Sequence, residues 1–521
     1  MVSACTSDQS SVSGPTVTCG STSTTLALSP GQYTALDPST DSGCVAFPAN
    51  GSTSDSAEYV VVALSAGGDT GATSPFLLRS TTATGTPLLD GPRVASRRAA
   101  ARGSIAVAFD RYLRTLGRAQ RGRAPVRAPA AVTPPTVGAL RAFSVCANGD
   151  CSVFKTVTAR ARSVGTHVAM YVDTLTPAGG LDSAQIDSLR QLFDSHVYAV
   201  DTTAFGGVSD VDSNGVVIVL MTPVVNALVT TAECNSGGYV VGFFFPPDLD
   251  PTNPSRGEIF YTIVADPSGK LSCPHTVDDV EFVLPGTFLH ELQHLISFNQ
   301  HVLVRGGDEE DLWLDEALSS FAEELGGRSF LPDTDTFLNY MSGDFYNAYQ
   351  YLLAPGTHFL LQTSDTVLAD FGAGWMFIRY LADQYGTSIT NKLVETSLTG
   401  TANVETQTGV PFPTTAARWA LANWVSDLPG FVPAPELQYA SWSFRPLFAA
   451  LSVADPFDFP VAFPLAPIAG PGAQVNLADT LHAGSGYYRR VLQGPGGAGF
   501  TLKLAGPSAV VNPRLVVLRV R

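Results

Sequence analysis

The stretch Thr287-Phe-Leu-His290-Glu291-Leu-Gln-His294-Leu-Ile-Ser-Phe298 carries the most specific pattern in the chain. It follows a Pro-Gly pair, and threonine often caps helix N-termini, so we expect a helix that begins near Thr287. Residues four apart on a helix differ by about 40° in direction and about 6 Å along the axis. His290 and His294 can therefore reach one metal ion, with Glu291 beside them.

A catalytic zinc site needs a third protein ligand and an open position. Residues 311–325 predict a second amphipathic helix with an acidic first turn and two glycines at its end. Glu316 lies on its apolar side, where a carboxylate is costly unless it is paired or binds metal. It follows His294 by 22 residues, enough for the chain to return antiparallel. We expect Glu316, in preference to Asp315 or Glu323, to be the third ligand. Glu323 is a candidate hydrogen-bond partner of a ligand, with a solvated side chain as the alternative.

The two segments resemble the gluzincin metallopeptidases, in which two motif histidines and a downstream glutamate hold zinc. The closer resemblance is to the hyicolysin family of bacterial neutral metallopeptidases, and it covers about residues 140–430. The segments that carry it, besides the histidine motif, are Trp313–Ser319, Ser163–Asp173, Phe205–Gly215, Gly242–Phe245, Glu258–Tyr261 and Gly372–Gly386.

This resemblance implies that His290, His294 and Glu316 bind Zn²⁺ and that Glu291 is the general base. The implied activity is that of an exported zinc-dependent metalloendopeptidase acting on proteins or peptides. Two alternatives stay open. Trp-Leu-Asp-Glu also resembles a motif of aminopeptidase-type exopeptidases, and a surface binding protein could retain a vestigial metallopeptidase fold.

The residue that stabilises the oxyanion is left open by the sequence. Its candidates follow the two predicted helices and are Tyr340, Tyr346, Tyr349, Tyr351 and His358. The other histidines stand alone, and we expect them to be ordinary surface or core residues: His167, His196, His275, His301 and His482.

A second metal motif begins at Asp210. Asp210, Asp212 and Asn214, followed by Gly215, reproduce the first half of an oxygen-rich Ca²⁺ loop. The closing acid of an EF-hand is missing, because Met221 stands at position 12. The segment is therefore either a calcium site completed by a residue from elsewhere or an Asx-rich turn.

The predicted fold class is α+β. We expect a gluzincin-like metallopeptidase domain, with a mixed sheet followed by the zinc-site helices, flanked by small β-sandwich-like modules. The segment between the first module and the catalytic domain carries ten arginines, and a solvated linker helix is expected there, with docking on an acidic or lipid surface as the alternative. The expected divisions are 1–24 (flexible tether), 25–84 (small β-sandwich), 85–138 (Arg/Ala/Pro-rich linker with one helix), 139–433 (zinc metallopeptidase domain) and 434–521 (C-terminal β module).

The cysteines predict an oxidising compartment. Six of the seven fall into neighbouring pairs, which predict three disulfides, 19/44, 146/151 and 234/273. Val2-Ser-Ala-Cys5 resembles the end of a bacterial lipoprotein signal, which makes Cys5 a candidate lipid anchor, with an ordinary tail as the alternative. We expect an extracellular or cell-envelope protein.

Composition excludes two other classes. With 30 Lys and Arg against 46 Asp and Glu, the net charge is −16, which repels nucleic acid. The longest nearly apolar run, Val216–Val229, is shorter than a membrane-spanning helix, so we expect no transmembrane span.

Overall fold

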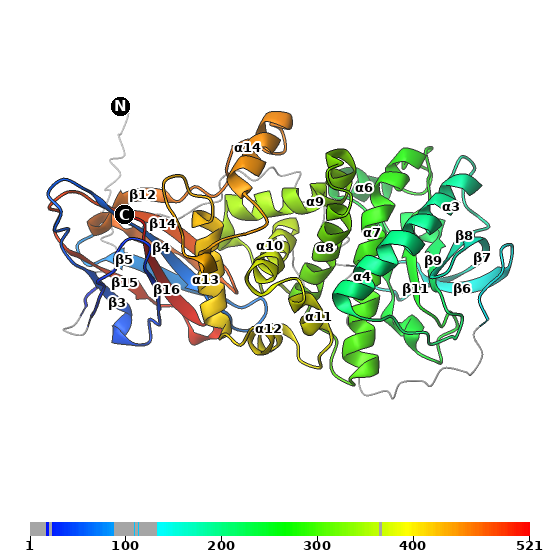
Figure 1. Cartoon of the computed structure of the whole chain (residues 1–521), viewed down its shortest axis with the longest axis horizontal. Coiled ribbons are helices and arrows are strands. Elements are labelled where there is room, and N and C mark those ends of the chain that lie inside the picture. The colour runs from blue at the N-terminus through cyan, green and yellow to red at the C-terminus, as the bar shows by residue number, and fades with distance from the viewer. Residues whose placement is uncertain (1–16, 20–22, 88–108, 110–112, 114–132, 364–366) are drawn as a thin grey trace, which may run out of the picture.

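Three parts follow one another along the computed structural model (Figure 1). A β-sandwich lies at one end, helices fill the middle, and a six-stranded sheet with its covering helices lies at the other end. The structure describes residues 17–19, 23–87, 109, 113, 133–363 and 367–521. The predicted mixed α+β class is confirmed, with strands preceding a helical region that carries the histidine motif.

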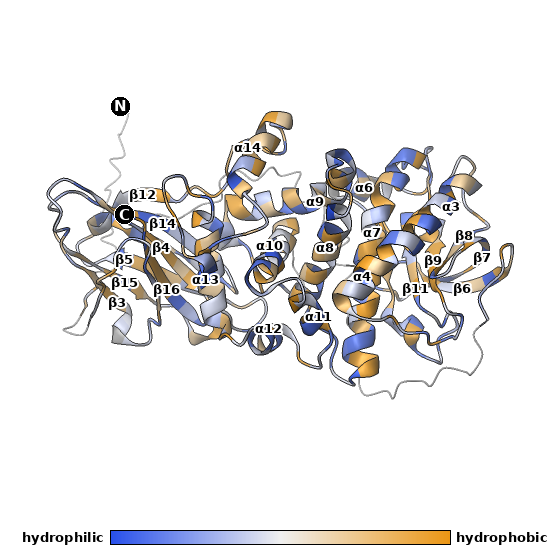
Figure 2. Cartoon of the chain, in the orientation of Figure 1, coloured by the Kyte–Doolittle hydropathy of each residue, from blue (hydrophilic) through white to orange (hydrophobic). Residues whose placement is uncertain are grey.

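The six-stranded sheet has the order β10-β11-β9-β8-β7-β6. Its middle strands β8, β9 and β11 are parallel, and β9 is buried along its whole length because helices and neighbouring strands cover it. Figure 2 shows the apolar residues gathered on β9 and α7, whereas the outer helix α3 is more polar. The elements are β6 (Leu140–Cys146), β7 (Phe154–Val164), β8 (Val168–Asp173), α3 (Ser183–Leu192), α4 (Tyr198–Phe205), β9 (Val217–Met221), α5 (Pro223–Asn226), α6 (Thr231–Gly237), β10 (Gly242–Phe244) and β11 (Ile259–Thr262).

The histidine motif lies in the second half of a long helix, α7 (Val277–Phe298). The expected start at Thr287 is wrong. Thr276 is the N-cap, in a reciprocal capping box with Asp279, and Pro285 and Gly286 lie inside the helix. The Thr287 hydroxyl donates to the Val283 carbonyl one turn back, so this residue stabilises a continuing helix.

The next helix, α8 (Leu312–Arg328), packs against α7. The sequence predicted an end at Gly326-Gly327, but both glycines are helical. Gly326 has a packing role instead, because a Cβ there would lie 2.2 Å from Cδ1 of Leu289. The two helices that carry the motif residues therefore approach each other closely.

Helices α9 and α10 pack against α8, and four further helices follow along the described part of the chain. Close packing recurs where Gly372 of α10 meets α9, since a Cβ at Gly372 would lie 2.2 Å from the carbonyl carbon of Asn347. These helices are α9 (Thr334–Leu353), α10 (Leu368–Tyr385), α11 (Ile389–Val394), α12 (Gly400–Thr408), α13 (Phe412–Val425) and α14 (Phe444–Ala454).

The N-terminal and C-terminal β regions together form one sandwich. The expectation of two separate β modules is therefore wrong. Strand β4 pairs on both sides with C-terminal strands, and so does β5. Alternation along a sequence predicts strands but not their partners, which is why the pairing was missed. The sheets have the orders β1-β3-β15-β5-β13 and β12-β14-β4-β16-β2. Their strands are β1 (Thr24–Thr25), β2 (Tyr33–Leu36), β3 (Cys44–Phe47), β4 (Ala57–Ser65), β5 (Thr73–Ser80), β12 (Ile468–Pro471), β13 (Asn476–His482), β14 (Gly486–Gln493), β15 (Phe500–Ala505) and β16 (Pro513–Arg519).

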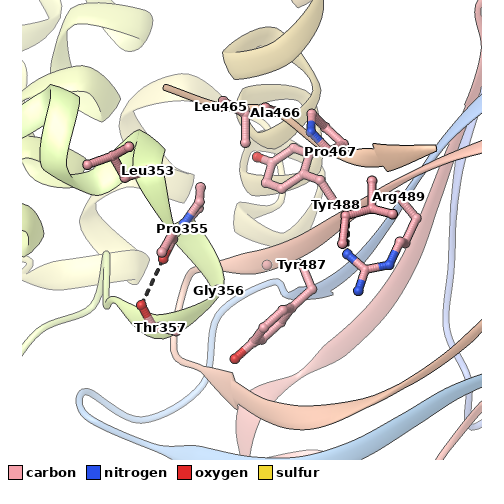
Figure 3. Close-up of a pocket in the computed structure, with 13 residues that line it drawn as sticks. Leu353, Pro355, Gly356, Thr357, Leu465, Ala466, Pro467, Tyr487, Tyr488 and Arg489 are labelled. Carbon is pink, nitrogen blue, oxygen red and sulfur yellow. Dashed lines mark hydrogen bonds between the residues drawn. The ribbon is translucent and has the colours of Figure 1, made fainter. Parts of the chain in front are cut away.

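Figure 3 shows the junction between the sandwich and the helices, around a small hollow. Gly356 lies against the Tyr487 ring, which leaves no room for a side chain there. The Tyr488 hydroxyl donates to the Ala420 carbonyl of α13, 2.8 Å away. The hollow is lined by residues 353–357, 465–468 and 486–489, and none of the metal-motif residues lines it.

Two residues of the arginine-rich linker are described, Phe109 and Leu113, and both are helical and buried. The Phe109 ring meets the Phe243 ring of β10 edge to face at 4.9 Å. Leu113 lines a small hollow together with His294 and Asp315. These two side chains pack on the sheet and α7, so they are not part of a fully solvated linker. The other residues of the predicted linker helix lie outside the described residues.

All three predicted disulfides are present, Cys19–Cys44, Cys146–Cys151 and Cys234–Cys273. Cys5 lies outside the described residues. Among the described residues, no helix combines the length and the hydropathy needed to cross a bilayer.

The helix packing predicts opposite effects at two glycines. Gly372→Ala should lower the free energy of unfolding by about 1–3 kcal/mol, because the new methyl group must push the α9 backbone away. Gly343→Ala, in α9 with open space around it, should raise that free energy by about 0.5–1 kcal/mol, since alanine favours the helix. Urea unfolding of both variants tests this. Equal effects of the two substitutions would contradict the packing.

Candidate metal centre

Helices α7 and α8 bring His290, His294 and Glu316 together. The Nε2 atom of His290 lies 3.5 Å from Oε2 of Glu316, and Nε2 of His294 lies 3.7 Å from Oε1 of the same carboxylate. One ligand atom from each residue falls within 4.8 Å of the other two. Ligands about 2.0–2.1 Å from a tetrahedral zinc ion stand roughly 3.3 Å from each other. Two imidazoles and a carboxylate at this spacing fit zinc.

Each histidine is also held through its other ring nitrogen. Nδ1 of His290 lies 2.8 Å from Oε1 of Glu323, and Nδ1 of His294 lies 2.8 Å from Oδ2 of Asp315. Such contacts fix the ring orientation and leave Nε2 pointing at the metal position. The sequence singled out Glu323 for this kind of contact. From the sequence, Asp315 is only an alternative third ligand. Its place next to Glu316 on the same helix could have indicated that it contacts a histidine of the motif.

Glu291 lies beside the ligands and is 6 % exposed. Burial raises the pKa of its carboxyl, while the charges of His290 and His294 and the Phe244 amide of β10 act in the opposite direction. In the described part of the chain, no hydrogen-bond partner reaches its Oε2 atom. This oxygen is therefore available to accept a proton.

His290 lies among several acidic groups. Burial lowers its pKa, but Glu316 and Glu323 outweigh burial, and its pKa lies well above the usual value in the metal-free protein. Two further carboxyls nearby, Asp201 of α4 and Asp344 of α9, are buried and have raised pKa values, chiefly because of burial. Neither belongs to a local motif, so the sequence did not indicate them.

Glu324, the residue after Glu323, links α8 to the neighbouring helical region through hydrogen bonds. Glu324 is fully buried and accepts hydrogen bonds from Arg328, Arg379, Trp375 and Trp442 at 2.6–3.1 Å. Its neighbours come from α8, α10 and the chain before α14. The network holds the helix that presents Asp315, Glu316 and Glu323 to the histidines.

The oxyanion candidates occupy other contacts. Tyr349 donates to the Val461 carbonyl, Tyr351 stacks on Trp419, and His358 lies 3.3 Å from Asp370. Tyr340 stacks on Phe330, and Tyr346 meets Phe459 edge to face. None of these contacts involves His290, His294 or Glu316.

Four of the remaining histidines have structural contacts. His167 stacks on Tyr198, His196 contacts the Gly326 carbonyl, His275 meets Tyr239 edge to face, and His482 contacts the Gly356 carbonyl. His275 also lies beside the sulfur atoms of Cys234 and Cys273, which form a disulfide.

Asp210 and Asp212, from the predicted calcium loop, form a second acidic group with Glu258. The Asn214 amide donates to Asp212 at 2.9 Å. Glu258 was not identified from the sequence as a site residue, because it lies 46 residues beyond Asp212.

Comparison with known proteins agrees with this geometry. No family model matches the chain. The protein named neutral metalloprotease ShpI, from Staphylococcus hyicus, is 27 % identical over 202 residues, which cover 38 % of this chain and 42 % of that protein. The chain is a distant homologue of a neutral metalloprotease. The match thus spans less than half of this relative, and together with the His290, His294 and Glu316 cluster it indicates a metallopeptidase.

The contacts at Nδ1 predict effects on metal affinity. Asp315→Asn and Glu323→Gln should each weaken zinc binding by about 10–100-fold, since a neutral partner holds the imidazole less strongly. Asp278→Asn, exposed in the first turn of α7, is the control and should bind zinc like the wild type. Competition with a zinc-sensitive dye measures the affinities. Unchanged affinity in both site variants would contradict the assigned contacts.

His301 predicts an acid-sensitive contribution to stability. It is fully buried in the π-helical segment Asn299–Val304 that follows α7, and burial lowers its pKa from 6.5 to about 4. A lowered pKa means that its contribution is complete above pH 6.5 and is lost as the pH falls towards 4. His301→Leu should therefore lose less thermal stability than the wild type between these pH values. Parallel melting-temperature curves would contradict the assignment.

Proposed function

We propose that this protein is a zinc-dependent endopeptidase that hydrolyses peptide bonds in protein substrates. The observation that carries the proposal is the convergence of His290, His294 and Glu316 on one point, with Glu291 beside it. The distant homology to a neutral metalloprotease supports the same class. The three disulfides support a site of action outside the cytoplasm or in the cell envelope.

His290, His294 and Glu316 would hold the zinc ion, in the donor set expected of a catalytic site with an open position. When bound, the ion polarises the substrate carbonyl and makes water a stronger nucleophile. Glu291 would accept a proton from the attacking water at Oε2 and deliver it to the departing amine. Its burial strengthens this role, since a raised pKa suits a group that both takes and returns a proton.

The sheet beside the site supports an extended substrate. Strand β10 is the edge of the six-stranded sheet, pairs with β11 alone among the described strands, and offers its Phe244 amide to Glu291. A peptide segment could bind along such an edge through main-chain hydrogen bonds, which do not require a free amino terminus. This supports internal cleavage over removal of terminal residues.

Glu291→Gln should retain zinc and lose roughly 10²- to 10⁴-fold in kcat/KM, because the amide cannot take the proton. Metal content by mass spectrometry and hydrolysis of internally quenched peptides provide the two readings. Cleavage by the variant at the wild-type rate would exclude Glu291 as the base. Wild-type protein that binds zinc but cleaves nothing would favour a vestigial, binding function.

Pairs of peptides with acetylated or free amino termini distinguish internal cleavage from the removal of terminal residues. An endopeptidase should cleave both at the same internal bonds with similar kcat/KM. Cleavage confined to the free-amine peptides, one residue at a time, would favour the aminopeptidase alternative.

A further inference from the structure

The loop that contains Asp210 and Asp212 resembles a Ca²⁺ loop without its closing acid. Glu258, just before β11 and next to β9 in the sheet, supplies a carboxylate at the loop. The loop itself lies directly before β9. Because β9 and β11 are parallel neighbours, both segments lie at the same edge of the sheet. Carboxylate oxygens of Asp210, Asp212 and Glu258 lie within 4.8 Å of one another. The sheet topology thus supplies the carboxylate that the sequence lacks at position 12.

Glu258 is held firmly in this position. Its side chain is 1 % exposed, and its Oε1 atom accepts hydrogen bonds from the Ser209 hydroxyl at 2.6 Å and the Val211 amide at 2.8 Å. Its Oε2 atom is buried and has no hydrogen-bond partner among the described residues. A carboxylate oxygen in that position is costly unless a cation or a proton satisfies it.

Asp212 packs the loop against the chain segment that carries Glu258. A Cβ at Gly257, the residue before Glu258, would lie 2.8 Å from Oδ2 of Asp212, so the two chain segments touch. Arg141 lies 3.3 Å from that carboxylate and offsets one of the three negative charges. The guanidinium of Arg256 contacts the Val211 carbonyl, and among the described residues it forms no ion pair with these carboxylates. Asp210 and Asp212 are partly exposed, which leaves a path for an ion from solvent.

We propose that Asp210, Asp212 and Glu258 bind one Ca²⁺ ion, separate from the zinc centre. The three carboxylates provide up to six oxygens, and water completes the shell of six to eight that calcium accepts. Calcium is favoured over magnesium because it accepts six to eight oxygens in irregular geometry, whereas magnesium demands a compact octahedral cage that three carboxylates from two chain segments do not form.

The ion would stabilise a loop that also contacts the zinc helix. Just before the acidic residues, the Gly207 carbonyl accepts hydrogen bonds from Asn299 at 2.8 Å and Gln300 at 2.6 Å, the two residues that follow α7. Fixing the loop therefore fixes the end of the helix that carries His290 and His294. We expect calcium to raise the thermal stability of the whole α7 region.

The test is calorimetric titration of Ca²⁺ into the zinc-loaded full chain, with melting temperatures measured with and without millimolar calcium. Wild type should bind one Ca²⁺ per chain and melt several degrees higher in its presence. Glu258→Gln and Asp210→Asn should each lose at least 10-fold in calcium affinity while keeping full zinc content. Asp335→Asn, an exposed carboxylate on α9, is the matched control and should behave as wild type.

The melting temperature of Glu258→Gln, measured with and without calcium, also distinguishes a calcium ligand from a glutamate that has only a structural role. Without calcium, its melting temperature should equal or exceed that of wild type, because a buried charge beside two others is removed. With calcium, wild type should become the more stable protein. No binding by wild type, or equal binding by Glu258→Gln, would overturn the proposal, and neither result depends on peptide cleavage.

Discussion

The structure depends on an electrostatic contact between two buried helix faces. Helix α7 presents two imidazoles and a carboxyl, and α8 presents Asp315, Glu316 and Glu323 to them. The four carboxylates, Glu291, Asp315, Glu316 and Glu323, lie close together in a largely buried site and repel one another unless cations or protons balance their charge. Glu316 and Glu323 raise the pKa of His290, and a proton on this imidazole offsets part of their charge. A divalent ion at the centre would do so more completely, and metal binding would then be coupled to the packing of the two helices.

Contacts with the surrounding fold hold α7 and α8 in their relative positions. Gly326 lets α8 approach Leu289, and Glu324 fixes α8 to α10 through two arginines and two tryptophans. The six-stranded sheet supports α7 from the other side, where Phe288 packs on Phe193 and Phe260. The sandwich joins the helices at Gly356 and Tyr488 and contributes no residue to the cluster of His290, His294 and Glu316.

Local chemistry was readable from the sequence because it depends on spacing within single helices. The i, i+4 histidines and Glu316 on an apolar helix face obey such short-range rules. The disulfides were predicted on a different basis, because each cysteine pairs with its neighbour in the order of cysteines along the chain. Properties that depend on distant pairing were not readable. The shared sandwich requires β4 and β5 to find C-terminal partners, and Glu258 approaches Asp212 only because β9 and β11 are neighbours. The predicted start of α7 is wrong because the Pro285-Gly286 pair does not end the preceding helix. The helix begins earlier, at the Thr276 capping box, and continues through both residues.

The central claim is that His290, His294 and Glu316 hold a zinc ion. X-ray diffraction from crystals of the zinc-loaded protein, recorded on either side of the zinc absorption edge, tests it directly. The account predicts one strong anomalous peak, present only above the edge, between the two Nε2 atoms and the Glu316 carboxylate, about 2.0–2.2 Å from each. A peak elsewhere, or none at this position in crystals that contain zinc, would contradict it.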